Sequence, residues 1–151
     1  MAVAHVSVSA APKPTGITLS NQCPASFQLV KGVCRLRNQY LQFSSLQGAG
    51  VGGLRTGLPK FRDGFTPKQI DLGRYLFFDP VLSGDGTVSC ASCHQPDKGF
   101  SDGLARSRGI KGQTLKRNAP SLWNVGFQSK FFWDGRAHTL EEQMLGPMYD
   151  S

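Results

Sequence analysis

Cys90-Ala91-Ser92-Cys93-His94 is the stretch that most constrains the fold of this 151-residue chain. C-x-x-C-H is the attachment signature of c-type haem. On a helix, Cys90 and Cys93 share a face, so both thiols can add to the two vinyl groups along one porphyrin edge. His94 follows on the same face and can place an imidazole nitrogen under the iron. The motif therefore predicts one covalently bound haem c, with His94 as its proximal ligand.

Two other kinds of site also use closely spaced cysteines. A zinc site needs a fourth ligand. Four residues outside the motif could provide one: Cys23, Cys34, His5 and His138. None of them has the paired spacing of a zinc knuckle. A thioredoxin-like redox pair accompanies a βαβ unit, and the sequence contains no such pattern. Haem attachment is therefore the leading interpretation.

The sequence on either side of the motif contains two helix-start signals. Thr66-Pro67-Lys68-Gln69 is a capping box with proline at the first helical position, and it predicts a helix that ends near Phe78. Thr139-Leu140-Glu141-Glu142 is a second capping box, and it predicts a helix that Gly146-Pro147 terminates. No alternating strand pattern stands out.

The composition favours short helices joined by long loops. The chain contains 18 glycines and 9 prolines, which together exceed average usage. Long loops usually need something to wrap around, and a haem would meet that need. We therefore predict an all-α fold, a cytochrome c-like haem domain with short helices and long loops. An extended, disulfide-containing N-terminal arm would precede it.

We expect three segments along the chain. Residues 1–22 have no usable periodicity, which predicts an extended arm. Residues 23–65 would form a disulfide loop and linker, with a short helix over residues 35–43 and a flexible glycine-rich connector at residues 48–53. Residues 66–151 would form the cytochrome c-type haem domain.

The first cysteine pair bears on the cellular compartment. Cys23 and Cys34 have ten residues between them, which suits a disulfide in a small loop. A chain-entropy argument gives such a loop about 3 kcal/mol of stabilisation, and two buried free thiols are the alternative. A disulfide and the assembly of haem c both imply an oxidising compartment. We therefore expect a periplasmic or otherwise exported protein.

The charge of the chain restricts its partners. The net charge is +7, and the tightest basic group lies in a glycine-punctuated stretch without interleaved aromatics: Arg106, Arg108, Lys111, Lys116 and Arg117. A nucleic-acid footprint needs clustering on one face or along a helix, so we expect no nucleic-acid partner. Steering of an acidic protein partner is a better use of this charge. No run of 18 apolar residues occurs, which excludes a membrane-spanning helix.

Several further segments follow a recognisable order and spacing around the motif. They are Leu72-Gly73-Arg74-Tyr75-Leu76-Phe77-Phe78-Asp79, Phe100-Ser101-Asp102-Gly103, Arg117-Asn118-Ala119-Pro120-Ser121-Leu122, Phe132-Trp133-Asp134-Gly135-Arg136 and Leu140-Glu141-Glu142-Gln143. Together they resemble the N-terminal haem domain of the bacterial di-haem cytochrome c peroxidase family, which includes the MauG-type enzymes. The resemblance covers roughly residues 66–148.

The resemblance implies roles for residues outside the haem motif. Trp133 matches the tryptophan that lies between the two haems of the family and relays electrons; a core aromatic beside two phenylalanines is the alternative. Asn118 matches a ligand of the calcium ion between the haem domains. Gln143 and Pro147 match residues on the distal side of the N-terminal haem. The implied partners are a second haem domain or subunit, a small electron-donor protein and hydrogen peroxide.

The sequence departs from the family pattern in three ways. Residues 108–116 contain no histidine, whereas many of these peroxidases carry one there as a distal ligand. A second C-x-x-C-H is absent, and the family's distal glutamate would fall just beyond Ser151. We therefore expect a haem that is open on its distal side, as in the MauG-type members. The chain would be half of an enzyme, either a fragment or one subunit.

Two alternative functions follow from the residues themselves. Met144 and Met148 stand about fifty residues after His94, a plausible separation for the methionine ligand of a His/Met electron-transfer cytochrome. Helix packing is the other interpretation of these methionines. The second alternative is a non-catalytic haem-binding subunit that docks to a partner. Elsewhere, His138 is expected at the surface.

Overall fold

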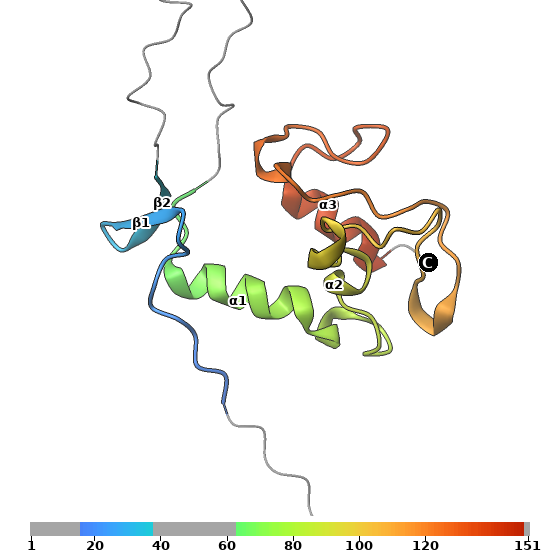
Figure 1. Cartoon of the computed structure of the whole chain (residues 1–151), viewed down its shortest axis with the longest axis horizontal. Helices are drawn as coiled ribbons and strands as arrows, with labels where there is room; N and C mark the ends of the chain where they lie inside the picture. Colours follow the sequence, from blue (N-terminus) through green and yellow to red (C-terminus); the bar gives the residue numbers. More distant parts are fainter. Residues whose placement is uncertain (1–15, 38–62, 150–151) are drawn as a thin grey trace, which may run out of the picture.

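The described part of the chain consists of a β-hairpin and a helical part. The computed structural model describes residues 16–37 and 63–149 (Figure 1). The strands are β1 (Phe27–Val30) and β2 (Val33–Leu36), and the helices are α1 (Pro67–Phe78), α2 (Cys90–Cys93) and α3 (Leu140–Tyr149). Short 3-10 turns occur at Pro80–Leu82, Pro96–Lys98, Ile110–Gly112 and Val125–Phe127. The predicted connector at residues 48–53 lies outside the described residues.

Helix α1 begins and ends where the sequence predicts. The Thr66 hydroxyl accepts from the Gln69 N–H at 3.3 Å, and the Gln69 side chain accepts from the Thr66 N–H at 2.9 Å. Pro67 occupies the first turn, where its missing N–H leaves no hydrogen bond unmade. The helix ends at Phe78 because Asp79 is already extended, as expected for a residue before proline. α1 packs against α2, the helix that carries the cysteine motif.

The prediction of an all-α fold is correct only in part, because residues 27–36 form an antiparallel hairpin. Leu29 pairs with Cys34, and Val30 pairs with Val33. Lys31 and Gly32 both have positive φ, 49° and 81°, as a two-residue hairpin turn requires. The predicted helix over residues 35–43 is wrong at its start, since Arg35 and Leu36 belong to β2.

A disulfide joins the hairpin to the segment before it, and a short bridge fastens the hairpin to the start of α1. The predicted Cys23–Cys34 disulfide is confirmed, and Cys34 is fully buried. The Cys34 N–H donates to the Phe65 carbonyl at 2.8 Å, and the Gly64 N–H donates to the Cys34 carbonyl at 3.0 Å. These bonds place the segment before α1 along the free edge of β2, so hairpin and helix form one unit.

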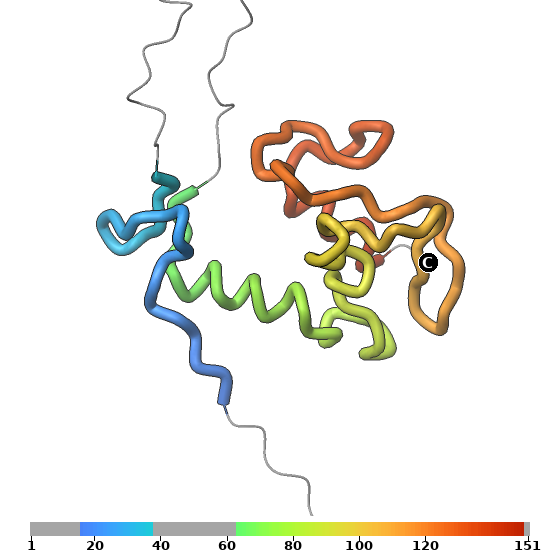
Figure 2. Tube along the Cα trace, in the orientation of Figure 1, coloured from blue at the N-terminus to red at the C-terminus, as the bar shows by residue number. Residues whose placement is uncertain are grey.

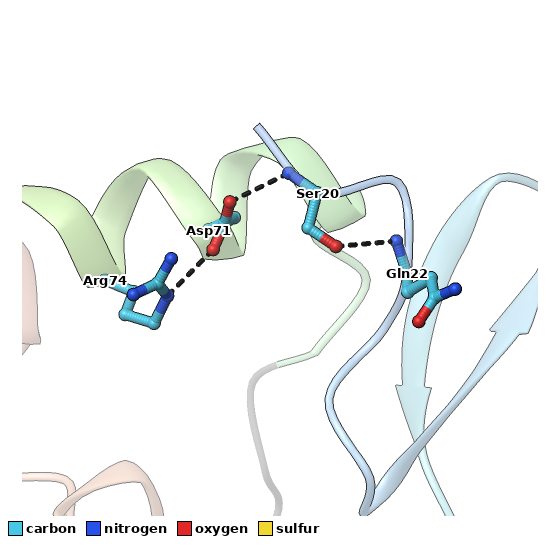
Figure 3. A network of polar contacts seen from close by, with 4 residues as sticks. All are labelled: Ser20, Gln22, Asp71 and Arg74. Atoms are coloured by element: carbon cyan, nitrogen blue, oxygen red, sulfur yellow. Dashed lines mark hydrogen bonds and ion pairs between the residues drawn. The ribbon is translucent and has the colours of Figure 1, made fainter. Parts of the chain in front are cut away.

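The described end of the arm also contacts α1 (Figure 3). The Ser20 N–H donates to Asp71 Oδ2 at 2.8 Å, and Arg74 Nε donates to Asp71 Oδ1 at 2.8 Å. The Ser20 hydroxyl in turn accepts from the Gln22 N–H at 3.1 Å. The Ser20 N–H and then Arg74 lower the pKa of Asp71. Residues 16–22 contain no helix or strand, and the rest of the predicted arm lies outside the described residues.

Helix α3 begins near its predicted start but continues past its predicted end. The Glu142 N–H donates to the Thr139 hydroxyl at 3.1 Å, while the Glu142 carboxylate accepts from the His138 N–H at 2.8 Å. The helix runs through Pro147 to Tyr149, so the predicted termination is wrong. Proline disfavours helix in the residue before it through a clash with that residue's Cβ, and Gly146 has no Cβ.

Few apolar side chains are buried in the helical part. Among residues 63–149 the buried apolar residues are Pro67, Ala119, Phe131 and Ala137. Large apolar side chains are instead exposed: Leu72, Phe78, Val81, Leu82, Leu104, Ile110, Trp123, Trp133, Met144, Leu145, Met148 and Tyr149. The long path from α2 to α3, traced in Figure 2, is mostly loop, as predicted. Within the described ranges, no helix has the length and hydropathy to cross a membrane.

Candidate haem-binding site

Both cysteines of the motif lie on α2, a single helical turn. The Ser92 hydroxyl accepts from the Ser89 N–H at 3.0 Å and thereby closes the start of the turn. Cys90 is exposed and Cys93 is half-buried. This turn brings the two thiols to one side of the chain, where one planar group with two reactive positions could bind both.

The two ring nitrogens of His94 differ in their surroundings. The chain leaves the helix at His94, whose N–H still donates to the Cys90 carbonyl at 2.9 Å. Nδ1 lies 2.9 Å from the carbonyl oxygen of Phe100. A carbonyl only accepts, so Nδ1 must carry a proton, which leaves Nε2 of a neutral ring with its lone pair. This is the arrangement found around histidines that bind metals.

A closed loop from Gln95 to Ser101 brings the Phe100 carbonyl to His94. The Gln95 N–H donates to the Ser101 carbonyl at 3.0 Å, and the Phe100 N–H donates to the Gln95 carbonyl at 2.8 Å. Gly99 and Phe100 both have left-handed backbone, with φ of 64° and 60°. Such a conformation is costly for phenylalanine and tends to occur at functional sites. Here it sets the direction of the carbonyl that holds His94.

The Phe100 ring belongs to an aromatic cluster beside this loop. Its ring centroid lies 6.4 Å from that of Phe77 and 5.9 Å from that of Trp123, both edge to face. The cluster lines an open cavity of about 560 Å³, bounded by Arg74, Phe77, Phe78, Pro96, Phe100, Leu122, Trp123 and Asn124. The two cysteines of α2 and His94 do not line it. Phe100 thus connects the two regions, through its carbonyl on one side and its ring on the other.

Cys93 lies against the loop of residues 104–117. Its Sγ is 3.7 Å from the Arg108 carbonyl oxygen. Burial raises the pKa of the Cys93 thiol, and the negative charge of Asp102 raises it further. Redox-active C-x-x-C pairs have lowered thiol pKa values, so the redox-pair alternative loses support. The zinc alternative loses support as well, because Cys23 and Cys34 are bonded to each other.

Trp133 is placed at the surface. It lies in a small closed loop in which the Phe131 N–H donates to the Ala137 carbonyl at 2.8 Å. The Trp133 side chain is 88% exposed, so the alternative of a core aromatic is wrong. The Arg136 guanidinium lies 3.6 Å over the Phe132 ring and bonds to Asp134 at 2.9 Å, which fixes the loop.

The other predicted site residues are spread over separate segments. Asn118 is exposed before the buried Ala119, Gln143 is half-buried in the first turn of α3, and Pro147 is exposed near its end. In residues 16–37 and 63–149, no three His, Cys, Asp or Glu side chains form a group that could bind a metal ion. Of the predicted residues, the structure brings together Cys90, Cys93 and His94.

Sequence reasoning missed the residues that support this trio. The carbonyls of Phe100 and Arg108 contact His94 and Cys93, and Asp102 acts on Cys93 through its charge. Phe100 and Asp102 belong to a segment that the family resemblance includes, but backbone carbonyls leave no mark in a residue pattern. The glycine before Phe100 was the one available signal of an unusual turn.

Comparison with known proteins identifies related sequences over the helical part. The family described as di-haem cytochrome c peroxidase matches residues 67–151. Methylamine utilization protein MauG from Methylorubrum extorquens is 48% identical over 83 residues, which are 55% of this chain and 24% of that protein. Cytochrome c551 peroxidase from Nitrosomonas europaea is 45% identical over 86 residues, 55% of this chain and 26% of that protein.

A solved structure shares both sequence and fold with the chain. The crystal structure of a MauG-like protein associated with microbial copper homeostasis is 37% identical, with a TM-score of 0.58. The match covers 66% of this chain and 32% of that one. The matched region thus spans about a quarter of the length of the two curated relatives.

Proposed function

Because the chain belongs to the di-haem cytochrome c peroxidase family, we propose that residues 66–151 are a c-type haem domain that takes part in peroxide chemistry. The hydrogen bond between His94 Nδ1 and the Phe100 carbonyl, 2.9 Å long, carries the proposal. It orients the imidazole and leaves Nε2 to bind iron. The names of the relatives favour this function over an electron carrier.

The residues present fit a covalently attached haem. Cys90 and Cys93 provide two thiols on one helical turn, and His94 provides the nitrogen ligand. The exposed apolar side chains of the helical part suit a large apolar ligand or a partner better than water. When bound, haem supplies an iron that can react with hydrogen peroxide.

The protein residues would then hold and tune this group. Thioether bonds from Cys90 and Cys93 would fix its edge to α2. The Phe100 carbonyl would make His94 a stronger ligand by accepting a hydrogen bond from its Nδ1–H. Gln143, half-buried in α3, is our candidate for a polar group on the opposite, distal side.

We also infer that the distal side is open. Residues 108–116 contain no histidine that could take the distal position. A ferric holoprotein should therefore give a high-spin EPR signal and bind cyanide readily. A low-spin His/Met spectrum that disappears in Met144→Ala or Met148→Ala would instead establish an electron carrier.

The remaining roles involve other domains and proteins. Trp133 would pass electrons from a second haem domain, supplied by further chain or by a subunit, and a small electron-donor protein would reduce that domain. Asn118 would contribute an oxygen ligand to a calcium ion between the domains. The Cys23–Cys34 disulfide supports an exported, periplasmic location for the protein.

Replacement of His94 tests the proposed ligation. His94→Gly should lose the absorption spectrum of histidine-ligated haem, and added imidazole should restore it by occupying the vacated volume. His138→Gly is the matched control, since His138 is exposed at the start of α3. It should keep the wild-type spectrum. A His94→Gly holoprotein with an unchanged spectrum would show that another residue binds the iron.

A further inference from the structure

Asp102 is a buried carboxylate to which the proposed function gives no role. Asp102 is only 4% exposed, and the nearby Ser107 is 2% exposed. Burial of a carboxylate is costly unless hydrogen bonds or opposite charges compensate it. A charge kept in such a place therefore calls for a structural or electrostatic reason.

The contacts of Asp102 explain how its charge is tolerated. Its Oδ1 accepts from the Leu104 N–H at 2.9 Å, and its backbone carbonyl accepts from Lys98 Nζ at 3.2 Å. The Ser107 hydroxyl lies close enough to be the largest influence that lowers the pKa of Asp102, although it makes no hydrogen bond of good geometry. The carboxylate is therefore ionised at neutral pH.

These contacts lie at the base of a long loop, residues 104–117. The Ser107 N–H donates to the Arg117 carbonyl at 3.1 Å, and the Leu115 N–H donates to the Ser107 carbonyl at 2.8 Å. The loop closes above Ser107, and Figure 2 shows it projecting from the helical part (yellow to orange). Leu104, whose N–H donates to the carboxylate, and Ser107, whose backbone closes the loop, thus lie where the loop leaves the helical part.

The residue after Ser107 brings the same loop into contact with the haem motif. The Arg108 carbonyl lies 3.7 Å from Cys93 Sγ. Asp102 also directly follows Ser101, whose carbonyl accepts from the N–H of Gln95, the residue after His94, at 3.0 Å. Asp102 is therefore connected to Cys93 through the loop, and its charge lies close to the haem motif.

We propose that Asp102 is a positioning residue of the haem site, which folds the loop of residues 104–117 onto Cys93 and keeps a permanent negative charge close to the haem motif. The role rests on the proposed function, because it concerns the group that Cys93 would anchor. A nearby anion favours the ferric over the ferrous state of a haem. Asp102 therefore lowers the reduction potential in addition to holding the loop.

Two measurements on the haem-loaded full chain test the two parts of this role. Trypsin cleaves after the loop's exposed basic residues, so the rate of cleavage between residues 104 and 117 reports how closely the loop is held. The midpoint reduction potential reports the charge. Asp102→Asn should speed cleavage and raise the potential, by an amount equal to about a three- to tenfold change in the equilibrium constant for reduction.

Asp97→Asn is the matched control, since it removes the same charge from an exposed position just after the motif. It should leave both the cleavage rate and the potential at wild-type values. Asp102→Glu keeps the charge on a longer side chain. It should therefore return the potential toward the wild-type value, an effect that a purely structural role does not predict. It also provides a charged variant to measure if Asp102→Asn assembles poorly.

Haem-loaded Asp102→Asn protein that matches Asp97→Asn in cleavage and potential would overturn the role of Asp102 and leave the haem domain intact. A wild-type chain that never acquires covalent haem would overturn both.

Discussion

At the scale of single residues, the protein controls His94 through one backbone carbonyl. Phe100 accepts the left-handed conformation, φ 60°, that aims its carbonyl at His94 Nδ1. The energetic cost of this conformation is of order 1–3 kcal/mol, and contacts of the Phe100 ring with Phe77 and Trp123 help to offset it. The orientation of His94 and the aromatic packing therefore depend on the same residue.

Trp133 provides a prediction at this scale. Since its side chain is 88% exposed, Trp133→Phe should change the free energy of unfolding by no more than about 0.5 kcal/mol in urea titration. The same variant should remove most of the peroxidase turnover gained when a second haem domain is present. Full turnover in Trp133→Phe would remove the relay role.

At the scale of elements, signals contained within a few residues predicted structure well. The capping box of Thr66 and Gln69 gave both ends of α1 with the help of Asp79-Pro80. Strands β1 and β2 were missed because they have four residues each, too few for alternation to stand out. The signal for the hairpin was the Lys31-Gly32 pair between two short β-prone runs.

In the site as well, contacts between residues close in sequence were predicted and contacts between distant segments were missed. Cys90, Cys93 and His94 are close in sequence, so their spacing alone placed them together. The carbonyls of Phe100 and Arg108 approach through loop closure, which depends on contacts distant in sequence. The predicted end of α3 was wrong because the expectation that Pro147 stops the helix took no account of the glycine before it.

Removal of the disulfide should affect the hairpin and leave the haem site unchanged. Cys23→Ser with Cys34→Ser should destabilise the hairpin by about 3 kcal/mol, since the closed loop is released. Amide hydrogen exchange should accelerate in β1 and β2, while the haem absorption spectrum stays the same. Unchanged exchange would mean that the bridge from Cys34 to Phe65 and the Arg35–Asp63 ion pair suffice to hold the hairpin.

Two glycines should respond in opposite ways to alanine. A Cβ at Gly146 would lie 2.6 Å from Cζ of Phe132, so Gly146→Ala should destabilise the protein by about 1–3 kcal/mol. A Cβ at Gly73 would meet nothing within 4 Å, so Gly73→Ala should stabilise α1 by about 0.5–1 kcal/mol. Urea titration measures both. Equal effects would contradict the packing of Phe132 on α3.

The contact between the arm and α1 should depend on pH. The Ser20 N–H and then Arg74 hold the pKa of Asp71 below its usual value of 3.8. A lowered carboxyl pKa means that the contact stabilises the fold above pH 3.8 and is lost as the pH falls through the lower, folded-state value. The protection of the Ser20 amide against hydrogen exchange, measured relative to its intrinsic exchange rate at each pH, should therefore fall only in acid. Asp71→Asn should abolish this dependence; acid-sensitive protection in that variant would refute the assignment.

At the scale of the whole molecule, the hairpin and the haem motif lie at opposite ends of α1 (Figure 1). The hairpin lies before the region that matches the family, which begins at residue 67. The helical part keeps many large apolar side chains exposed and few buried. In our account these side chains surround haem or meet a partner domain, and covalent attachment at α2 anchors the arrangement.

The central claim is that Cys90 and Cys93 hold haem covalently, and the mass of the denatured protein tests it most directly. After acid-acetone treatment, chain produced in a host that assembles haem c should retain the mass of one haem. Cys90→Ala with Cys93→Ala should lose it, while Cys23→Ser with Cys34→Ser should keep it. Haem released into the acetone, with both thiols of α2 free in the wild-type chain, would contradict the account.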